Sequence, residues 1–288
     1  MKKIIVFAAI AAMVIPFVSC NNKIDYGDGP QAKIEKAKYT EVAKKVTIKE
    51  GTASTTQGIK EIEFTDGGRY IITRNQGTKA EGDEILTGTY RIENLIYILE
   101  NFGKVEFGAD GSLTITLSNG DTVTGSYEEE DKLPDNDFTR DIAHTWKIDG
   151  VDLSVVADGK NVGVSKPNGG CNLEVIGQEL LDQAKNLGAN VSLDLSKFKG
   201  YNVVSLSFTS SNTFIVEFSG AEPFKANVSG ITGYSFKYKL EVGSENDILN
   251  AEAECKFEPQ TEKTAWLTVK VNGDGFTGRI IFFLSVTD

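Results

Sequence analysis

The sequence contains little histidine, methionine, proline and cysteine. Its 288 residues include 1 His, 2 Met, 6 Pro and 3 Cys. A single histidine, His144, leaves almost no material for His-based catalysis or metal binding. Three cysteines are too few for a disulfide framework, and 40% apolar side chains exclude a disordered chain. The 29 glycines instead suit a turn-rich β protein.

The common catalytic and cofactor motifs are also missing. The chain has no GxxxxGK followed by Ser or Thr, no HExxH, no CxxC and no GxSxG. The pattern GxGxxG occurs at residues 273–278, but a dinucleotide site requires a helix after it, and the strand-like residues 279–284 follow instead. Nothing singles out two of the 41 acidic residues as the carboxylate pair of a glycosidase. We therefore predict a protein that is not an enzyme, with no catalytic residues, no cofactor and no metal site.

The first 20 residues are organised like a bacterial secretion signal. Lys2 and Lys3 give a positive start, residues 4–18 form an unbroken apolar run, and Ser19 and Cys20 follow. A membrane-spanning helix requires about 20 apolar residues, so this run is short for a permanent span. No later apolar run is as long. We predict a signal peptide over residues 1–19.

The end of this segment, Phe17-Val18-Ser19-Cys20, resembles the lipobox of bacterial lipoproteins in its Bacteroidetes form. The resemblance implies that Cys20 is linked to diacylglycerol and becomes the new N-terminus, and several acyl chains together anchor a protein stably. Residues 20–29 would form a polar tether. The absence of Asp after Cys20 resembles sorting to the outer membrane or cell surface. The periplasmic face remains open, and an ordinary secreted protein is the alternative.

Removal of the signal peptide takes away Lys2 and Lys3 and leaves 28 basic and 41 acidic residues, a net charge of −13. Phosphate backbones repel such an acidic protein, so we predict no nucleic-acid partner, and the membrane would be contacted through lipidated Cys20. Cys171 and Cys255 then remain as a pair in an oxidising compartment and are a candidate disulfide. The alternative is two buried free thiols in a β core.

The first domain is predicted over residues 30–134. Residues 30–46 have a helix-forming composition and one apolar face, which predicts a short helix. From Ile62 to Tyr127 apolar residues alternate at period two in about seven segments, which predicts consecutive antiparallel strands. The pairs Asp110-Gly111 and Asn119-Gly120 predict two-residue hairpin turns, because glycine readily adopts a positive φ.

A charged run separates the two halves of the chain. Residues 128–137 (EEEDKLPDND) hold six carboxylates, one Lys and Pro134 and are predicted to be a solvated linker. A calcium site is the sharper alternative, because clustered carboxylates suit Ca²⁺. The run lacks the loop glycine and the distal Glu of an EF-hand, which favours the linker.

The second domain is predicted over residues 135–288. Its residues 174–187 have an apolar face at helical spacing, and Gly188 is well placed to end the helix. Seven further segments alternate at period two between Val204 and Leu284. Sequential strands with tight turns predict a mainly β fold of two antiparallel β-meander domains, each an up-and-down barrel or a curled sheet with one short helix.

The second domain resembles the lipocalin-like modules of Bacteroidetes lipoproteins of unassigned function. Trp146 near the first strand, the long meander and Arg279 in the last strand carry the resemblance, which implies that Arg279 stacks on Trp146. Tyr234, Tyr238 and Trp266 are candidates for binding a small apolar or glycan ligand. We therefore predict a lipid-anchored, non-catalytic binding protein of the cell envelope. The alternative is a structural or protein-interaction component, and a hydrolase is the third hypothesis.

Overall fold

The computed structural model describes residues 44–49, 58–65, 67–75, 83–157, 160–188, 195–242, 249–273 and 276–287. The predicted signal peptide, Cys20, the tether and residues 30–43 of the predicted N-terminal helix lie outside these residues. Residues 44–46, at the end of that helix, belong instead to strand β1 (Lys44–Ile48), so the helix prediction is wrong there. Val46 and Ile48 are buried with exposed Thr47 between them, and such a β-branched, alternating run fits a strand.

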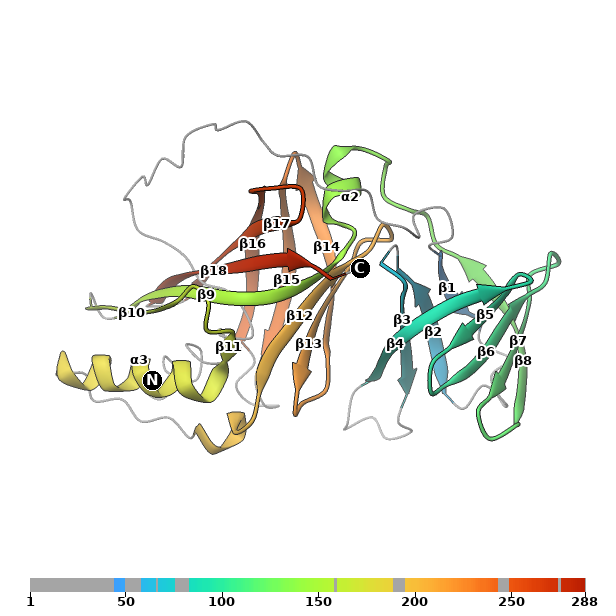
Figure 1. Cartoon of the computed structure of the whole chain (residues 1–288), viewed down its shortest axis with the longest axis horizontal. Coiled ribbons are helices and arrows are strands. Elements are labelled where there is room, and N and C mark those ends of the chain that lie inside the picture. Colours follow the sequence, from blue (N-terminus) through green and yellow to red (C-terminus); the bar gives the residue numbers. More distant parts are fainter. Residues whose placement is uncertain are drawn as a thin grey trace.

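Eight antiparallel strands form the first barrel (Figure 1). Each strand pairs with the next along the chain, and β1 pairs with β8, so the sheet closes on itself. The seven strands predicted between Ile62 and Tyr127 are confirmed. The strands after β1 are β2 (Ile59–Phe64), β3 (Arg69–Asn75), β4 (Asp83–Glu93), β5 (Ile96–Leu99), β6 (Gly103–Phe107), β7 (Ser112–Leu117) and β8 (Thr122–Glu129).

The hairpin loops are one residue longer than predicted. At Asp110-Gly111 the N–H of Gly108 donates to the carbonyl of Ser112 at 2.8 Å, which leaves three loop residues between the bonded pair. Hairpin loops of this length commonly end in a left-handed residue, and Gly111 has φ 80°. Gly120 has the same role, with φ 91°. The glycines are needed for their positive φ, but in three-residue loops.

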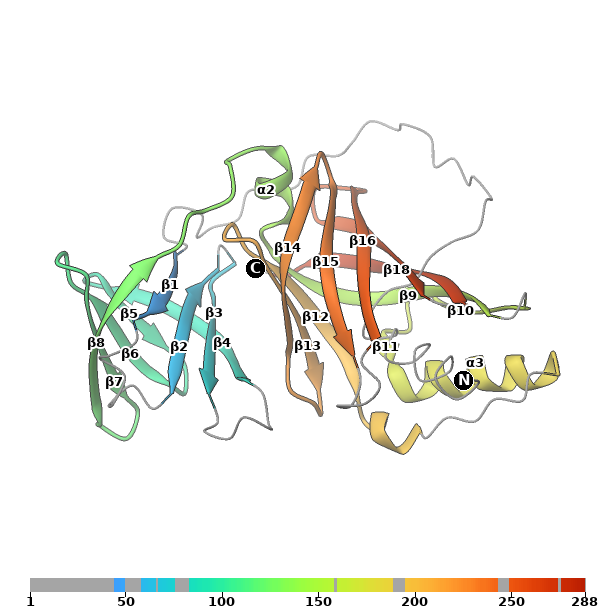
Figure 2. The same ribbon diagram turned by 180° about the vertical axis from the view of Figure 1, so that it is seen from behind.

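Eight further antiparallel strands form the second barrel, which β9 closes by pairing with both β18 and β12. Strands β10 and β11 extend this sheet, and Figure 2 shows β14, β15 and β16 from the side hidden in Figure 1. The predicted fold class is therefore confirmed. The strands are β9 (Thr145–Ala157), β10 (Lys160–Lys166), β11 (Cys171–Asn172), β12 (Asn202–Phe208), β13 (Thr213–Ser219), β14 (Phe224–Thr232), β15 (Ser235–Val242), β16 (Leu249–Pro259), β17 (Thr264–Gly273) and β18 (Phe276–Val286).

A short helix, α2 (Asp137–Ile142), follows the segment predicted as a solvated linker and includes its last residue. Asn136 caps this helix by accepting a hydrogen bond from the N–H of Thr139 at 3.0 Å. Phe138 and Ile142 are buried in the core of the second barrel. The end of the linker is therefore ordered, because two apolar side chains attach it to the barrel.

Helix α3 (Leu173–Asn186) agrees with the helix predicted over residues 174–187. It packs beside β10, and the 3-10 helix η2 (Leu195–Phe198) follows it. The Gln183 side chain accepts a hydrogen bond from the N–H of Gly163 at 3.0 Å and donates one to the Gly163 carbonyl at 2.6 Å. One side chain thus satisfies the backbone at the sheet edge, where a neighbouring strand could otherwise pair.

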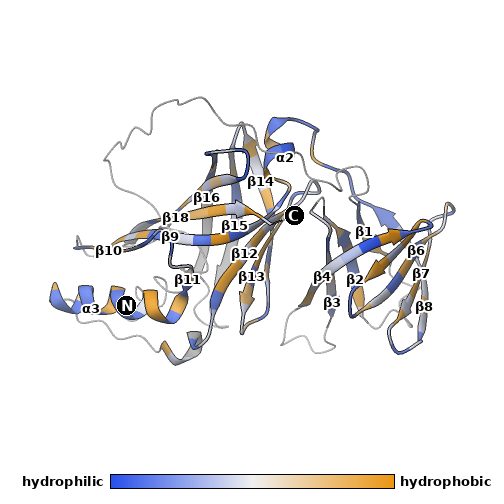
Figure 3. Ribbon diagram, in the orientation of Figure 1, coloured by the Kyte–Doolittle hydropathy of each residue, from blue (hydrophilic) through white to orange (hydrophobic). Residues whose placement is uncertain are grey.

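Each barrel has its own apolar core. Apolar and polar residues are interspersed along the strands (Figure 3), because alternate side chains point inward and outward. The barrels lie side by side, with β3 and β4 of the first next to β12 and β13 of the second (Figures 1 and 2). The outward faces of these strands therefore meet.

Candidate functional site

The structure does not bring the three candidate ligand-binding residues together. Tyr238 is 2% exposed and faces the core of the second barrel. Tyr234 is half-buried, and its hydroxyl donates to the carboxylate of Asp141 in α2 at 2.6 Å. Trp266 lies on the outer face of β17, where its ring contacts Phe283 edge to face at 5.7 Å between centroids. Ligand binding by these residues remains a prediction.

Several aromatic side chains are in contact with one another in the interior of the second barrel. Phe208 and Phe214 stack with 4.8 Å between ring centroids, and Phe236 meets Phe208 edge to face at 5.5 Å. Trp146 and Phe257, each 0% exposed, have centroids 5.1 Å apart. Rings at these distances are in direct contact. This part of the interior is therefore a packed core and not the lining of a ligand cavity.

The stacking of Arg279 on Trp146 that the lipocalin-like resemblance implies is wrong. The indole N–H of Trp146 points to α2 and donates to the carbonyl of Ile142 at 3.0 Å. Ile280 belongs to the core of the barrel, so its neighbour Arg279 points to the outside. The two side chains lie on opposite faces of the sheet.

Cys171 and Cys255 are both buried free thiols. Cys171 lies on β11 and Cys255 on β16, and these strands are not neighbours in the sheet. The candidate disulfide is therefore not formed, and the alternative of two free thiols holds. Burial raises the pKa of Cys171 to about 12, so its thiol stays protonated and unreactive near neutral pH.

Buried polar residues gather where the two barrels meet. The outer face of β2 and β3 packs against the outer face of β12, β13 and β14, with Ile71 and Ile215 each 1% exposed. Glu63 and Thr213 on these faces are 0% exposed. Polar groups are costly to bury unless they find partners, so this interface is the candidate functional site. Further buried polar residues here are Lys45, Thr65, Thr209, Ser210 and Ser211.

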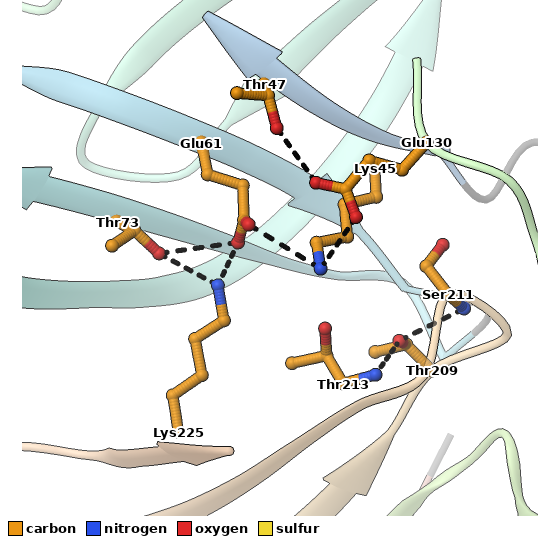
Figure 4. Close-up of polar contacts among 9 residues, drawn as sticks. All are labelled: Lys45, Thr47, Glu61, Thr73, Glu130, Thr209, Ser211, Thr213 and Lys225. Atoms are coloured by element: carbon orange, nitrogen blue, oxygen red, sulfur yellow. Dashed lines mark hydrogen bonds and ion pairs between the residues drawn. The ribbon is translucent and has the colours of Figure 1, made fainter. Parts of the chain in front are cut away.

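One group of ion pairs crosses the interface at Glu61 (Figure 4). Lys225 of β14 contacts the Glu61 carboxylate directly and donates to the hydroxyl of Thr73 at 2.9 Å. The other Glu61 oxygen lies 3.5 Å from the ammonium of Lys45, which also lies 3.1 Å from Glu130. Burial lowers the pKa of Lys225 to about 7, and the charge of Lys45 contributes to this decrease.

A second ion pair crosses the interface at Glu217 of β13. Arg69 of β3 contacts one Glu217 oxygen directly, and Thr87 of β4 donates to the same oxygen at 2.8 Å. Ser205 of β12 donates to the other oxygen at 2.5 Å. Three partners from both barrels therefore satisfy this carboxylate, which limits the cost of its burial.

The β12–β13 hairpin contributes a buried polar loop to the interface. The carbonyl of Ser210 accepts a hydrogen bond from the N–H of Leu133 at 2.5 Å. The Thr209 hydroxyl accepts from the N–H groups of Ser211 and Thr213 at 3.3 and 3.1 Å (Figure 4). The hairpin is thus held by its own hydroxyl groups and by the linker between the barrels.

Glu63 differs from the other interface carboxylates because both of its oxygens lack a hydrogen-bond partner. Burial raises the pKa of Glu63 to about 7. The hydroxyls of Thr209 and Thr213 and the charge of Lys45 act in the opposite direction, and Glu130 adds to the rise. The two hydroxyls are therefore close to the carboxyl group, although neither is in hydrogen-bonding geometry with it.

Sequence reasoning misses this interface. Alternation along β2 places Glu61 and Glu63 on the outer face of the barrel, where charged residues are expected to meet water. The partner Lys225 lies 164 residues further along the chain. No local pattern marks these residues, because their burial depends on how the two barrels pack.

Among the described residues, no group of three or more His, Cys, Asp or Glu side chains could hold a metal ion. The linker carboxylates of Asp135 and Asp137 instead lie 3.1 and 3.7 Å from the guanidinium of Arg140. In the same described part of the chain, no helix combines the length and apolar character required to cross a membrane.

No family model matches the sequence, and no curated protein matches it. A solved structure of transferrin binding protein B (TbpB), isotype 1, from serogroup B Neisseria meningitidis is similar with a TM-score of 0.29 and 12% identity. The match covers 85% of this chain and 43% of that one, so the chain spans less than half the length of that protein.

Two further solved structures are similar at the same low level. Intact Ap-TbpB, with N and C lobes, matches with a TM-score of 0.26 and 12% identity over 84% of this chain and 45% of that one. A protein of unknown function from the DUF3598 family of Nostoc punctiforme matches with a TM-score of 0.23 and 9% identity over 85% of this chain and 94% of that one. No family assignment follows from likeness of this degree.

Proposed function

We propose that this chain is a lipid-anchored, non-catalytic protein of the cell envelope that binds a protein partner through the outer surface of its two barrels. The direct contacts between aromatic rings inside the second barrel support this function over the binding of a small apolar or glycan ligand there. Rings in contact leave no space between them for a ligand. Recognition would then use the outer faces and the loops.

The membrane attachment in this proposal is the predicted one. Cleavage after residue 19 would leave lipidated Cys20 at the N-terminus, and residues 20–29 would connect the anchor to the folded part. The proposed location is the outer membrane or cell surface. An anchored protein has a reduced search volume, so even a modest contact area can hold a partner in the same envelope.

The β4–β5 hairpin supplies a specific candidate contact. Asn94 and Leu95 form its two-residue turn, with φ 51° and 67°. The Leu95 side chain is 87% exposed. A left-handed leucine costs roughly 1 kcal/mol that glycine avoids, and an exposed leucine gains little from burial within the chain. Stability therefore does not explain leucine at this position, whereas contact with a partner does.

Leu95→Gly tests the proposal. Asn-Gly is the preferred pair for a two-residue hairpin, so we expect the variant to unfold at an equal or higher urea concentration. A photo-crosslinking residue at exposed Glu93, expressed in the native host, should capture one protein, and Leu95→Gly should abolish the capture. Leu187→Gly, at another leucine that is 50% exposed, is the matched control and should leave capture unchanged.

Two results would contradict the proposed function. One is a crosslinked protein that persists in Leu95→Gly at the level seen in the Leu187→Gly control. The other is the absence of any crosslinked protein together with a bound mass of a few hundred daltons that native mass spectrometry detects and denaturation releases.

A further inference from the structure

Glu63 lies where the first barrel meets the β12–β13 hairpin of the second. Its side chain is on the outer face of β2 and is 0% exposed. Neither carboxyl oxygen has a hydrogen-bond partner, and the hydroxyl of Thr213 is also buried without one. The Thr209 hydroxyl lies near the Glu63 carboxyl group and already accepts two backbone hydrogen bonds. It can therefore take part in a further hydrogen bond only as a donor.

The charged groups around Glu63 on the described elements are engaged with one another. They are Lys45 on β1, Glu61 on β2, Arg69 on β3, Glu217 on β13, Lys225 on β14 and Glu130 in the linker. Residues 209–213 of the hairpin carry no ionisable side chain. Lys45 lies directly across from Glu63 in the β1–β2 pairing, but its ammonium is already paired with Glu61 and Glu130. An ionised Glu63 would therefore be a buried charge whose nearest cation is shared with two other carboxylates, which is unfavourable.

We propose that Glu63 is a proton-operated latch between the two barrels. Uptake of one proton by its carboxylate favours the docked arrangement, and release of that proton favours separation of the barrels. The protonated carboxyl group is neutral, its O–H can donate to one threonine hydroxyl, and its carbonyl oxygen can accept from the other. Separation returns the group to water, where the carboxylate is well solvated.

The direction of the effect follows from the two protonation equilibria. The ordinary pKa of the carboxyl group is 4.5, and in the docked arrangement burial raises it to about 7. The docked state binds the proton more tightly, so docking is strongest at acidic pH and weakens as the pH rises through this interval. For Glu63 alone, the two values correspond to a docking constant that is roughly 300-fold smaller at alkaline pH than at strongly acidic pH. Between pH 5.5 and pH 8.5 the decrease is about 30-fold.

Distance measurements between spin labels on the two barrels test the latch. The sample is the chain from residue 20 onward with Cys20→Ser, labelled at exposed Lys104→Cys and Lys256→Cys, and followed through a low-urea series so that separation becomes measurable. Glu63→Gln is neutral at every pH but keeps the opposing response of Lys225, whose lowered pKa favours docking as the pH rises. We expect the urea concentration at which longer distances appear in the parent chain to fall, relative to that of Glu63→Gln, as the pH is raised from 5.5 to 8.5.

The matched control is Glu254→Gln on the exposed face of β16, which should keep the pH response of the parent chain. Parent and Glu63→Gln curves that run parallel from pH 5.5 to 8.5 would overturn the proposal, because the fall assigned to Glu63 would then be absent. Carbon-13 NMR titration of the Glu63 carboxyl needs no substitution. A midpoint near 7 is expected, and a midpoint near 4.5 with the barrels docked would also overturn the proposal.

Discussion

Gly88 of β4 lies directly opposite Tyr70 of β3, and the absence of a side chain there makes room for the tyrosine ring. A Cβ atom at position 88 would lie 2.5 Å from Tyr70 Cε1 and 2.7 Å from its hydroxyl oxygen. Carbon atoms in contact are normally about 3.5–4.0 Å apart. The ring is 4% exposed, and its hydroxyl donates to the carbonyl of Glu100 at 2.9 Å. Gly88→Ala should therefore displace a buried, hydrogen-bonded ring.

The expected cost comes from two effects and one offset. Overpacking of a core costs about 1–3 kcal/mol, and loss of the Tyr70 hydrogen bond adds about 1 kcal/mol. Replacement of glycine by alanine within a regular element returns roughly 0.5–1 kcal/mol. We expect Gly88→Ala to lower the free energy of unfolding of the first barrel by about 2 kcal/mol.

Urea denaturation can measure this effect in the intact chain. The 2 Trp residues, Trp146 and Trp266, both lie in the second barrel, so their fluorescence follows that barrel, whereas far-UV circular dichroism follows both. Gly88→Ala should lower the midpoint seen by circular dichroism more than the midpoint seen by fluorescence.

A double-mutant cycle with Tyr70→Leu isolates the contact, because leucine removes the ring that meets the new Cβ. We expect Gly88→Ala to cost at least about 1 kcal/mol less in the Tyr70→Leu background than alone. A single-variant cost under about 0.5 kcal/mol, or two substitutions whose costs simply add, would refute the proposed clash.

Two further predictions concern the second barrel. Gln183→Leu removes both hydrogen bonds to Gly163 and should lower the free energy of unfolding by about 1–3 kcal/mol. It should also increase self-association through the uncovered edge of β10, which sedimentation measures. Gln178→Leu, at an exposed position on the same helix, is the control and should have neither effect. Cys171 and Cys255 should react with a thiol reagent at pH 8 only after urea unfolds the barrel, because burial raises the pKa of both, and rapid reaction in the native chain would contradict this expectation.

The strands of each barrel can be predicted from the sequence, because the position of a residue in the alternating pattern decides which face of the sheet its side chain lies on. Leu113 and Ile115 point inward whatever the rest of the chain does, once β7 is extended. The same local chemistry predicts α3, where an apolar face at helical spacing packs on the barrel. Glycine at positions 111 and 120 likewise marks the hairpins, although the loop length depends on which backbone groups pair.

Strand β1 shows where local reasoning fails. Its lysines follow a helix-forming segment, so composition favours a helix that continues through Val46. Val46 instead pairs with Ile62 on β2 and with Glu129 on β8. The pairing of β1 with β8 closes the barrel. Pairing with β8, a strand far away in the sequence, thus overrides a weak helix propensity.

The sequence by itself determined which segments form the strands and helix α3, whereas the lipid anchor at Cys20 and a role without catalysis stay predictions. Tertiary structure decided that the barrels close, that aromatic rings contact one another inside the second one, and that buried Glu63 and largely buried Glu61 and Lys225 lie between them. The physical reason is that alternation assigns a side chain to the inner or outer face, whereas packing of one barrel on the other decides whether the outer face meets water or protein.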